Sequence, residues 1–260
     1  MDILAIFIFL GEDENRRYTQ YIELLVKDKS IYSMHLRLSF WFHAVKNFTT
    51  AEGGAVTWRQ DIGLNDEALH RQYMLLSLHG QSKDALTKSQ LGSWEYDILL
   101  LGYKYNMTDI LAAIGLKQLD RYGNLLKRRR ELVSLYERLT NTARIESLKH
   151  ASEDFLSSHN LYLVRIPEFS ETERNDLILL MEKDGISCNV HYKPLPMFTA
   201  YKKLGFCIEN YPNSLAQYRN EISLPLHTHL KDENVEYIAE RFLYNLELTK
   251  NKQLDRNSVI

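Results

Sequence analysis

A single lysine, Lys46, stands in surroundings that suit covalent chemistry. Residues 42–54 read FHAVKNFTTAEGG, so Lys46 has apolar and small neighbours and precedes a Gly-Gly turn. A lysine attacks a carbonyl carbon only when its amine is neutral, and desolvation or a nearby positive charge lowers its pKa far enough. Taken alone, the segment favours a solvated surface lysine, since lysine is rarely buried. A covalent nucleophile is the alternative interpretation.

This segment resembles the signature of the DegT/DnrJ/StrS family of sugar aminotransferases, which usually reads Ser-Phe-His-x-x-Lys-x-x-Thr-x-Glu-Gly-Gly. The residues that match are His43, Lys46, Thr49 or Thr50, Glu52, Gly53 and Gly54. Four further family-like stretches follow in the expected order: residues 78–80 (LHG, without the family's Arg), 102–119 (beginning GYKYNMTD), 190–195 (VHYKPL) and 222–226 (ISLPL). The resemblance covers residues 40–248, which is most of the chain.

The resemblance implies an activity and a cofactor. In this family the lysine forms a Schiff base with pyridoxal 5′-phosphate, and this role falls to Lys46, which would also move the proton between the substrate α-carbon and C4′ of the cofactor. An amino donor, usually glutamate, loads the cofactor, and a nucleotide-linked keto sugar then takes the amine. The products are amino sugars for surface polysaccharides such as lipopolysaccharide. The cofactor supplies the electron sink, and the protein supplies binding, orientation and charge.

Three further site residues are implied by the resemblance. Asn106 would reach across the interface of a homodimer towards the cofactor phosphate of the partner. From the residues alone, Asn106 lies just before a predicted helix, where the backbone N–H groups favour an anion, although an ordinary capping residue is the alternative. His191 and Tyr192 would lie near the sugar or nucleotide of the substrate. Without the family they read as a histidine at a strand end and a packed tyrosine.

The sequence departs from the family on the N-terminal side of the lysine. Family members have there a Gly-Thr or Gly-Ser turn for the phosphate, a ring that stacks on the cofactor and an Asp that pairs with the pyridine nitrogen. Here Asp2, Asp13 and Asp28 precede Lys46, and none lies in a family-like context. Trp41 replaces the family's small Ser. We therefore expect a truncated or frame-disrupted family chain. Its alternative function is that of a catalytically inactive remnant with a structural or interaction role.

The elements that must position these residues indicate an α/β fold. The resemblance implies the C-terminal part of an aspartate-aminotransferase-like (fold type I) large domain plus a small α+β C-terminal domain. We expect three regions: a non-family segment at 1–38, a partial cofactor-binding domain with a connecting helix at 39–140, and the small domain at 141–260. Apolar periodicity and turn residues predict the following elements: strands at 3–10, 55–58, 160–166 and 186–192, and helices at 17–26, 65–78 (capped by Gly80), 108–139 (with a break near Gly123), 170–184, 213–219 and 232–248.

The composition is that of an ordinary globular protein of 260 residues, with 45% hydrophobic and 25% charged residues. The net charge of −2 gives no attraction to nucleic acid or to an anionic membrane. The basic run Lys127–Arg130 is interpreted as a solvated helix face. The apolar run at 3–10 is too short to span a membrane. Cys188 and Cys207 form no metal or disulfide pattern, so we expect small buried thiols, no bound metal and a cytoplasmic protein.

Overall fold

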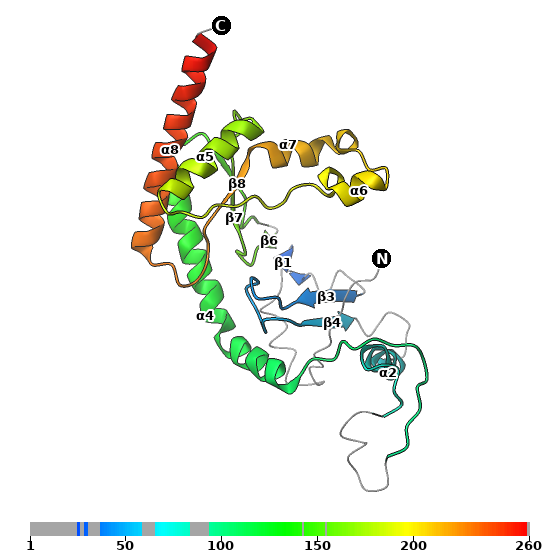
Figure 1. Cartoon of the computed structure of the whole chain (residues 1–260). Coiled ribbons are helices and arrows are strands. Elements are labelled where there is room, and N and C mark those ends of the chain that lie inside the picture. The colour runs from blue at the N-terminus through cyan, green and yellow to red at the C-terminus, as the bar shows by residue number, and fades with distance from the viewer. Residues whose placement is uncertain are drawn as a thin grey trace. The chain divides into compact units, whose positions relative to one another are not determined.

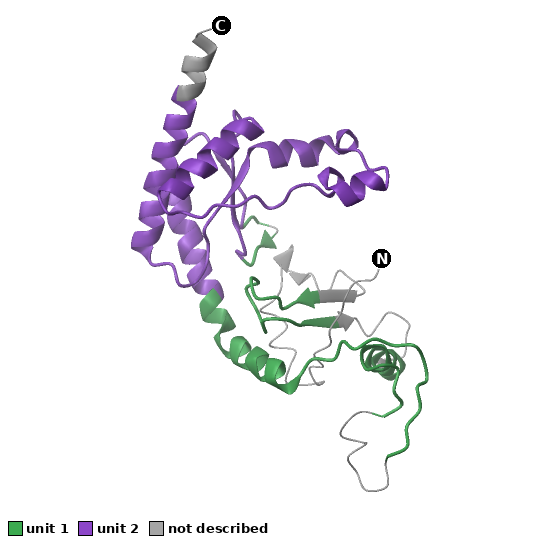
Figure 2. Ribbon diagram, viewed as in Figure 1, with its two compact units in different colours: residues 1–125, 151–158 green, residues 126–150, 159–260 purple. Residues whose placement is uncertain are grey.

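The computed structural model describes residues 25–26, 29–30, 37–58, 66–83, 94–141, 143–153 and 155–258. The chain separates into two compact units, one formed by residues 1–125 and 151–158, the other by residues 126–150 and 159–260 (Figure 2). The strand expected at 3–10, most of the helix expected at 17–26 and the residues Asp2, Asp13 and Asp28 lie outside the described ranges. The three domain limits expected from the sequence stay a prediction.

The first unit contains a hairpin of two antiparallel strands, β3 (Arg37–Trp41) and β4 (Gly54–Trp58), with Trp41 opposite Gly54 and Arg37 opposite Trp58 (Figure 1). This register places the two ends of the loop at residues 42–53 side by side. The strand predicted at 55–58 is thereby confirmed. The hairpin is the element that carries Lys46.

A second, smaller sheet in this unit corrects one prediction. Leu25–Val26, expected at the end of a helix, forms strand β1, which pairs antiparallel with β2 (Lys29–Ser30) and with β6 (Phe155–Leu156). The pairing of β1 with β6 joins segments that are far apart in the sequence. Periodicity within one segment does not reveal such a partner, and the sheet overrides the local helical pattern.

The helix predicted at 65–78 is confirmed as α2 (Asp66–Ser77), and the chain turns after it at His79 and Gly80. His79 has a φ of +58° and Gly80 a φ of +71°, and Gly80 donates its N–H to the Leu75 carbonyl at 2.7 Å, which is the bond that the residue after a left-handed helix cap makes. A Cβ added at Gly80 would stand 1.8 Å from the Leu100 carbonyl oxygen. Isolated bridges from Leu78 to Lys104 and from Gln81 to Ile98 extend this close approach of the two segments.

The helix predicted from residue 108 is α4 (Asp109–Thr140), and the break expected at Gly123 is wrong, because the helix runs through it without interruption. Glycine inside a helix costs only about 1 kcal/mol relative to alanine. Tyr122 and Leu126 on either side of Gly123 are buried, and burial of side chains of this size stabilises by more than that amount.

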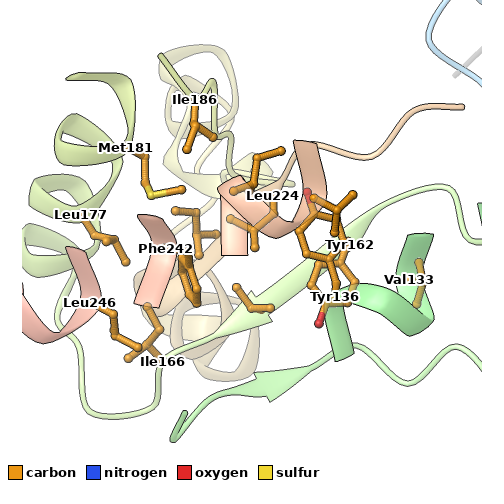
Figure 3. Close-up of a cluster of buried hydrophobic side chains, with 14 of the residues drawn as sticks. Val133, Tyr136, Tyr162, Ile166, Leu177, Met181, Ile186, Leu224, Phe242 and Leu246 are labelled. Atoms are coloured by element: carbon orange, nitrogen blue, oxygen red, sulfur yellow. The ribbon is translucent and has the colours of Figure 1, made fainter. Parts of the chain in front are cut away.

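The second unit is built on a sheet of order β5-β7-β8, formed by Glu146–Ser147, Tyr162–Arg165 and Glu221–Leu224, all antiparallel. The C-terminal part of α4, helix α5 (Glu171–Lys183) and helix α8 (Asp232–Ser258) contribute the core side chains that pack with the sheet. Figure 3 shows the following members of this core: Tyr136, Tyr162, Ile166, Leu177, Met181, Leu224, Phe242 and Leu246. Every residue of β8 is buried, so both of its faces are covered.

The predicted helices of this unit are confirmed, with adjusted ends. Helix α5 has a capping box in which Ser170 and Glu173 bond each other's backbone N–H groups. Helix α8 continues to Ser258, beyond the expected end at 248. The remaining helical elements are η3 (Leu195–Met197), α6 (Thr199–Lys203), η4 (Ile208–Asn210) and α7 (Pro212–Asn220).

The strand predicted at 186–192 is wrong. Only one bridge forms there, in which Asn189 exchanges two backbone hydrogen bonds with Ser223 of β8. The next N–H groups do not continue the ladder, because Val190 N–H donates to the Asn189 side chain and His191 N–H donates to the Glu221 carboxylate. Side-chain acceptors therefore replace the strand partner and end the pairing.

The basic run Lys127–Arg130 is not the fully solvated face that was predicted. Arg129 is buried and its Nη1 donates to the carbonyls of His159, Asn160 and Leu226 at 3.1–3.3 Å. The Arg129 guanidinium carries several N–H donors and so can bond these three carbonyl groups, which lie just before β7 and just after β8. Lys127 and Arg130 are exposed, as expected.

Candidate active site

The loop at residues 42–53 holds Lys46 by a set of short backbone hydrogen bonds. Phe42 N–H donates to the Gly53 carbonyl at 2.8 Å and closes the loop at its base. Thr50 N–H donates to the Phe42 carbonyl at 3.0 Å, and Lys46 N–H donates to the His43 carbonyl at 2.9 Å. These bonds fold the segment into a compact turn whose tip carries the lysine.

Two neighbouring threonines fix the returning half of the loop. Thr49 Oγ1 donates to the Phe42 carbonyl at 3.0 Å and accepts from Ala51 N–H at 2.9 Å. Thr50 is buried and its Oγ1 donates to the Glu52 carbonyl at 2.7 Å. The sequence left open which threonine matches the family position, and both hydroxyls bond the loop itself.

The loop is also attached to distant parts of its unit. Phe42 and Phe48 pack edge to face with ring centroids 4.6 Å apart, and Phe48 does the same with Tyr122 of α4 at 6.0 Å. Asn47, the residue after Lys46, donates its Nδ2 to the Ser158 carbonyl at 2.6 Å. The sequence did not predict this role of Asn47, because its partner Ser158 lies far along the chain and no local pattern indicates the pair.

Lys46 itself is half-buried. Among the residues that the structure describes, none forms a hydrogen bond or an ion pair with the Nζ of Lys46. His43 has its Nε2 3.6 Å from Glu52 Oε1, with both side chains exposed. A primary amine reacts with a carbonyl group when it is neutral, so Lys46 presents the functional group that this chemistry needs on a fixed backbone.

The segment with Asn106 packs against the same loop. Gly53 has a φ of +153°, and a Cβ added to it would stand 2.4 Å from Met107 Cε. Asn106 is exposed, accepts a hydrogen bond from Lys104 Nζ and lies three positions before α4. The structure thus places Lys46 and Asn106 in one unit, on segments that touch through Gly53 and Met107.

His191 and Tyr192 lie in the other unit. His191 is half-buried, and its Nδ1 lies 2.7 Å from Ser223 Oγ. Tyr192 is exposed, with its ring edge-on to the His191 ring at 4.7 Å. Sequence reasoning missed Glu221 and Ser223, which bond His191. The spacing of two between Glu221 and Ser223 could have indicated them, since residues two apart on a strand lie on the same face and can bond the same neighbour.

The cysteines differ from one another. Cys188 is half-buried, and burial raises the pKa of its thiol to about 12. Cys207 is exposed, unlike the buried thiol we predicted, and its Sγ donates to Glu209. In the part of the chain that the structure describes, no group of three His, Cys, Asp or Glu side chains could hold a metal ion, and no helix could span a membrane.

The fold is that of the fold type I aminotransferases. The structure resembles a protein of Streptococcus pneumoniae described as a sugar aminotransferase in its PMP-form, with a TM-score of 0.82 and 51% identity over 87% of this chain and 57% of the other. That protein is also known in a PLP-form. The chain itself belongs to the DegT/DnrJ/EryC1/StrS aminotransferase family, whose model matches residues 22–243. The match includes residues 22–38, which we had placed outside the family.

Two sequence relatives have informative names. The spore coat polysaccharide biosynthesis protein SpsC of Bacillus subtilis is 33% identical over 90% of this chain and 58% of its own length. A UDP-4-amino-4,6-dideoxy-N-acetyl-beta-L-altrosamine transaminase of Campylobacter jejuni is 31% identical over 86% of this chain and 56% of its own length. The chain therefore spans little more than half the length of these relatives.

Proposed function

We propose that this chain carries the lysine-bearing part of an aminotransferase that moves an amino group from glutamate to a nucleotide-linked keto sugar. The observation that carries the proposal is the half-buried Lys46, held at the tip of a fixed loop with no partner for its amine among the described residues. The names of SpsC and of the Campylobacter transaminase support a sugar as substrate and a surface polysaccharide as destination.

The residues present fit pyridoxal phosphate as cofactor. A primary amine is the group that bonds the aldehyde carbon of this cofactor, and Lys46 presents one on a backbone that is fixed on both sides. Asn106, beside the N-terminus of α4, offers an amide donor for a phosphate oxygen. When bound, the cofactor supplies the electron sink that the protein lacks.

Each site residue then has a separate task. Lys46 would hold the cofactor covalently, and its Nζ, once the amino group of the substrate has taken its place, would move the proton from the substrate α-carbon to C4′ of the cofactor. Asn106 binds the phosphate across the interface of a homodimer. His191 and Tyr192 bind the sugar or nucleotide. We place the reaction in the cytoplasm, where the free thiols Cys188 and Cys207 would stay reduced.

Exposed apolar side chains before and within the start of α4 support the homodimer. Large exposed apolar surfaces mark interaction sites. The following side chains of this stretch are exposed: Trp94, Tyr96, Ile98, Leu99, Leu101, Tyr103, Ile110 and Leu116. Asn106 lies in the middle of this stretch. A residue that binds the cofactor phosphate of the partner has to lie at the dimer interface, and this position agrees with that requirement.

The test uses the purified full chain mixed with pyridoxal phosphate. We expect a visible absorption band, and after borohydride reduction mass spectrometry should find the cofactor on the peptide that contains Lys46. Lys46→Ala should abolish the band. Lys117→Ala is the matched control, because Lys117 is an exposed lysine of the same unit that pairs with Asp120, and the band should persist. If the cofactor is found on other lysines, or no band forms, the proposal is wrong.

Amino transfer is measured separately. Glutamate and a nucleotide-linked keto sugar should give an aminated sugar with the unaltered chain and none with Lys46→Ala. A chain that binds the cofactor at Lys46 but yields no aminated sugar would lose the proposed activity. It would then be the inactive family protein with a structural or interaction role.

A further inference from the structure

Three polar side chains form a continuous hydrogen-bonded chain in the second unit. Ser223 Oγ donates to Glu221 Oε1 at 2.8 Å, and His191 Nδ1 lies 2.7 Å from the same Oγ. Glu221 Oε2 accepts the backbone N–H of His191 at 3.0 Å. Because Glu221 and Ser223 lie two residues apart on β8, both side chains point to the same face and meet His191 together.

Glu221 has the surroundings of a buried carboxylate. It is 1% exposed, and two donors converge on its two oxygens. Arg174, also buried, lies beside it and donates Nη1 to the Glu221 carbonyl at 3.1 Å and to the Tyr218 carbonyl at 2.8 Å. Burial raises the pKa of Glu221, while the hydrogen bonds from Ser223 and His191 N–H and the charge of Arg174 oppose this rise.

The proton count in this chain decides the state of the imidazole. An ionised carboxylate only accepts, and a serine hydroxyl has one hydrogen to donate. Ser223 gives that hydrogen to Glu221, so the contact with His191 requires a donor on the imidazole side. Nδ1 must therefore carry a proton. In a neutral histidine the other nitrogen, Nε2, is then the acceptor.

We propose that Glu221 and Ser223 are positioning residues that hold neutral His191 as the Nδ1–H tautomer, so that its Nε2 accepts a hydrogen bond from a hydroxyl of the nucleotide sugar. Imidazole in water favours the opposite tautomer, so the protein must impose this one. The sugar contact rests on the proposed function, whereas the tautomer does not.

The tautomer is measured on the full chain with histidine labelled in nitrogen-15, by long-range proton–nitrogen correlation at a pH where imidazoles are neutral. The spectrum of His191→Gln identifies the signals of His191. We expect a protonated Nδ1 and an unprotonated Nε2 in the unaltered chain. A spectrum that shows a protonated Nε2 in the unaltered chain would overturn the proposal, even before any variant of Glu221 or Ser223 is made.

Glu221→Gln gives the sharpest comparison, because it should reverse the tautomer. The glutamine carbonyl must accept the fixed N–H of His191, so its NH₂ group faces Ser223. Ser223 then accepts from the amide and donates to Nδ1, which leaves the proton on Nε2. A residue with a merely structural role would not move the proton between the two nitrogens. An unchanged tautomer in a folded Glu221→Gln protein contradicts the proposal.

Ser223 supplies a second, independent pair of variants. Ser223→Ala removes the acceptor, and His191 should shift to the tautomer that water favours. Ser223→Thr keeps the hydroxyl and should keep the Nδ1–H form, and circular dichroism checks that each variant folds. The Nδ1–H form persisting in Ser223→Ala would show that the serine does not set it.

UDP-N-acetylglucosamine serves as a probe of the sugar contact. Its addition should shift the Nε2 resonance of His191 in the unaltered chain, and the shift should be lost in Glu221→Gln. An unmoved resonance would overturn the sugar contact and leave the tautomer standing. Failure of cofactor attachment at Lys46, measured separately, would remove the proposed function and leave the tautomer unaffected.

Discussion

Gly53 and Met107 approach one another so closely that a Cβ on Gly53 would stand 2.4 Å from Met107 Cε. The same added atom would stand 2.6 Å from Thr50 Oγ1. Gly53 also closes the base of the loop by accepting the N–H of Phe42. The glycine therefore lets the loop with Lys46 fold back on itself and lie against the segment that precedes α4.

Gly53→Ala should lower the free energy of unfolding and weaken cofactor attachment at Lys46. Its φ of +153° is strained for alanine, which costs on the order of 1–3 kcal/mol, and the contacts add to it. We expect a loss of about 2–4 kcal/mol in urea unfolding. Gly185→Ala is the control, because its φ is +76° and nothing lies within 4 Å of the added Cβ. Equal losses in the two variants would show that the contact with Met107 is unimportant.

Gly80→Ala should be the more harmful of the two loop substitutions. Its added Cβ would stand 1.8 Å from the Leu100 carbonyl oxygen, which is backbone, whereas Met107 Cε is the flexible end of a side chain. The strain of a φ of +71° adds to the clash. We expect a loss of about 3 kcal/mol or more, again by urea unfolding. A smaller loss than in Gly53→Ala would contradict this order.

Arg129→Met should destabilise the second unit, because it leaves three carbonyl groups without their donor. The cost of unsatisfied buried acceptors suggests a loss of about 2–4 kcal/mol in the free energy of unfolding. Arg130→Met removes the same charge from the next position, where the side chain is exposed, and should change stability by no more than about 0.5 kcal/mol. Similar losses for both would restore the interpretation of this run as a solvated face.

Stability should fall in mild acid because of His150. Its ring stacks on His159 at 4.7 Å, and burial, followed by the charge of His159, lowers the pKa of His150 to about 4 from its ordinary 6.5. The folded pKa is the lower one, so the unfolded chain binds the proton first as the pH falls. This contribution is fully present above pH 6.5 and is lost between pH 6.5 and 4.

The expected loss from His150 is about 2 kcal/mol between pH 7 and pH 5, measured by urea unfolding at the two values. His150→Gln should flatten this dependence, since glutamine does not titrate. His229→Gln, at an exposed position, should leave it in place. A profile that is equally steep in His150→Gln would assign the loss to other groups.

Local patterns in the sequence were sufficient for several elements. The turn at Gly80 after α2 and the start of α4 after Thr108 depend on residues within one or two turns of each other. Predictions failed where a distant partner decides the structure. Leu25–Val26 becomes a strand because Phe155–Leu156 pairs with it, and the strand expected at 186–192 ends after one bridge because the Glu221 side chain takes the N–H of His191.

The candidate site also has features that local sequence patterns predict and features that depend on distant partners. The sequence by itself determined the family, the position of Lys46 and the short turn in which it stands, because residue types at fixed spacing define them. The tertiary structure alone decided that Asn47 bonds Ser158, that Met107 packs on Gly53 and that Glu221 and Ser223 bond His191. Hydrogen bonds and packing act through space, and a sequence records only the order of residues, so these partners became visible only once the chain was folded.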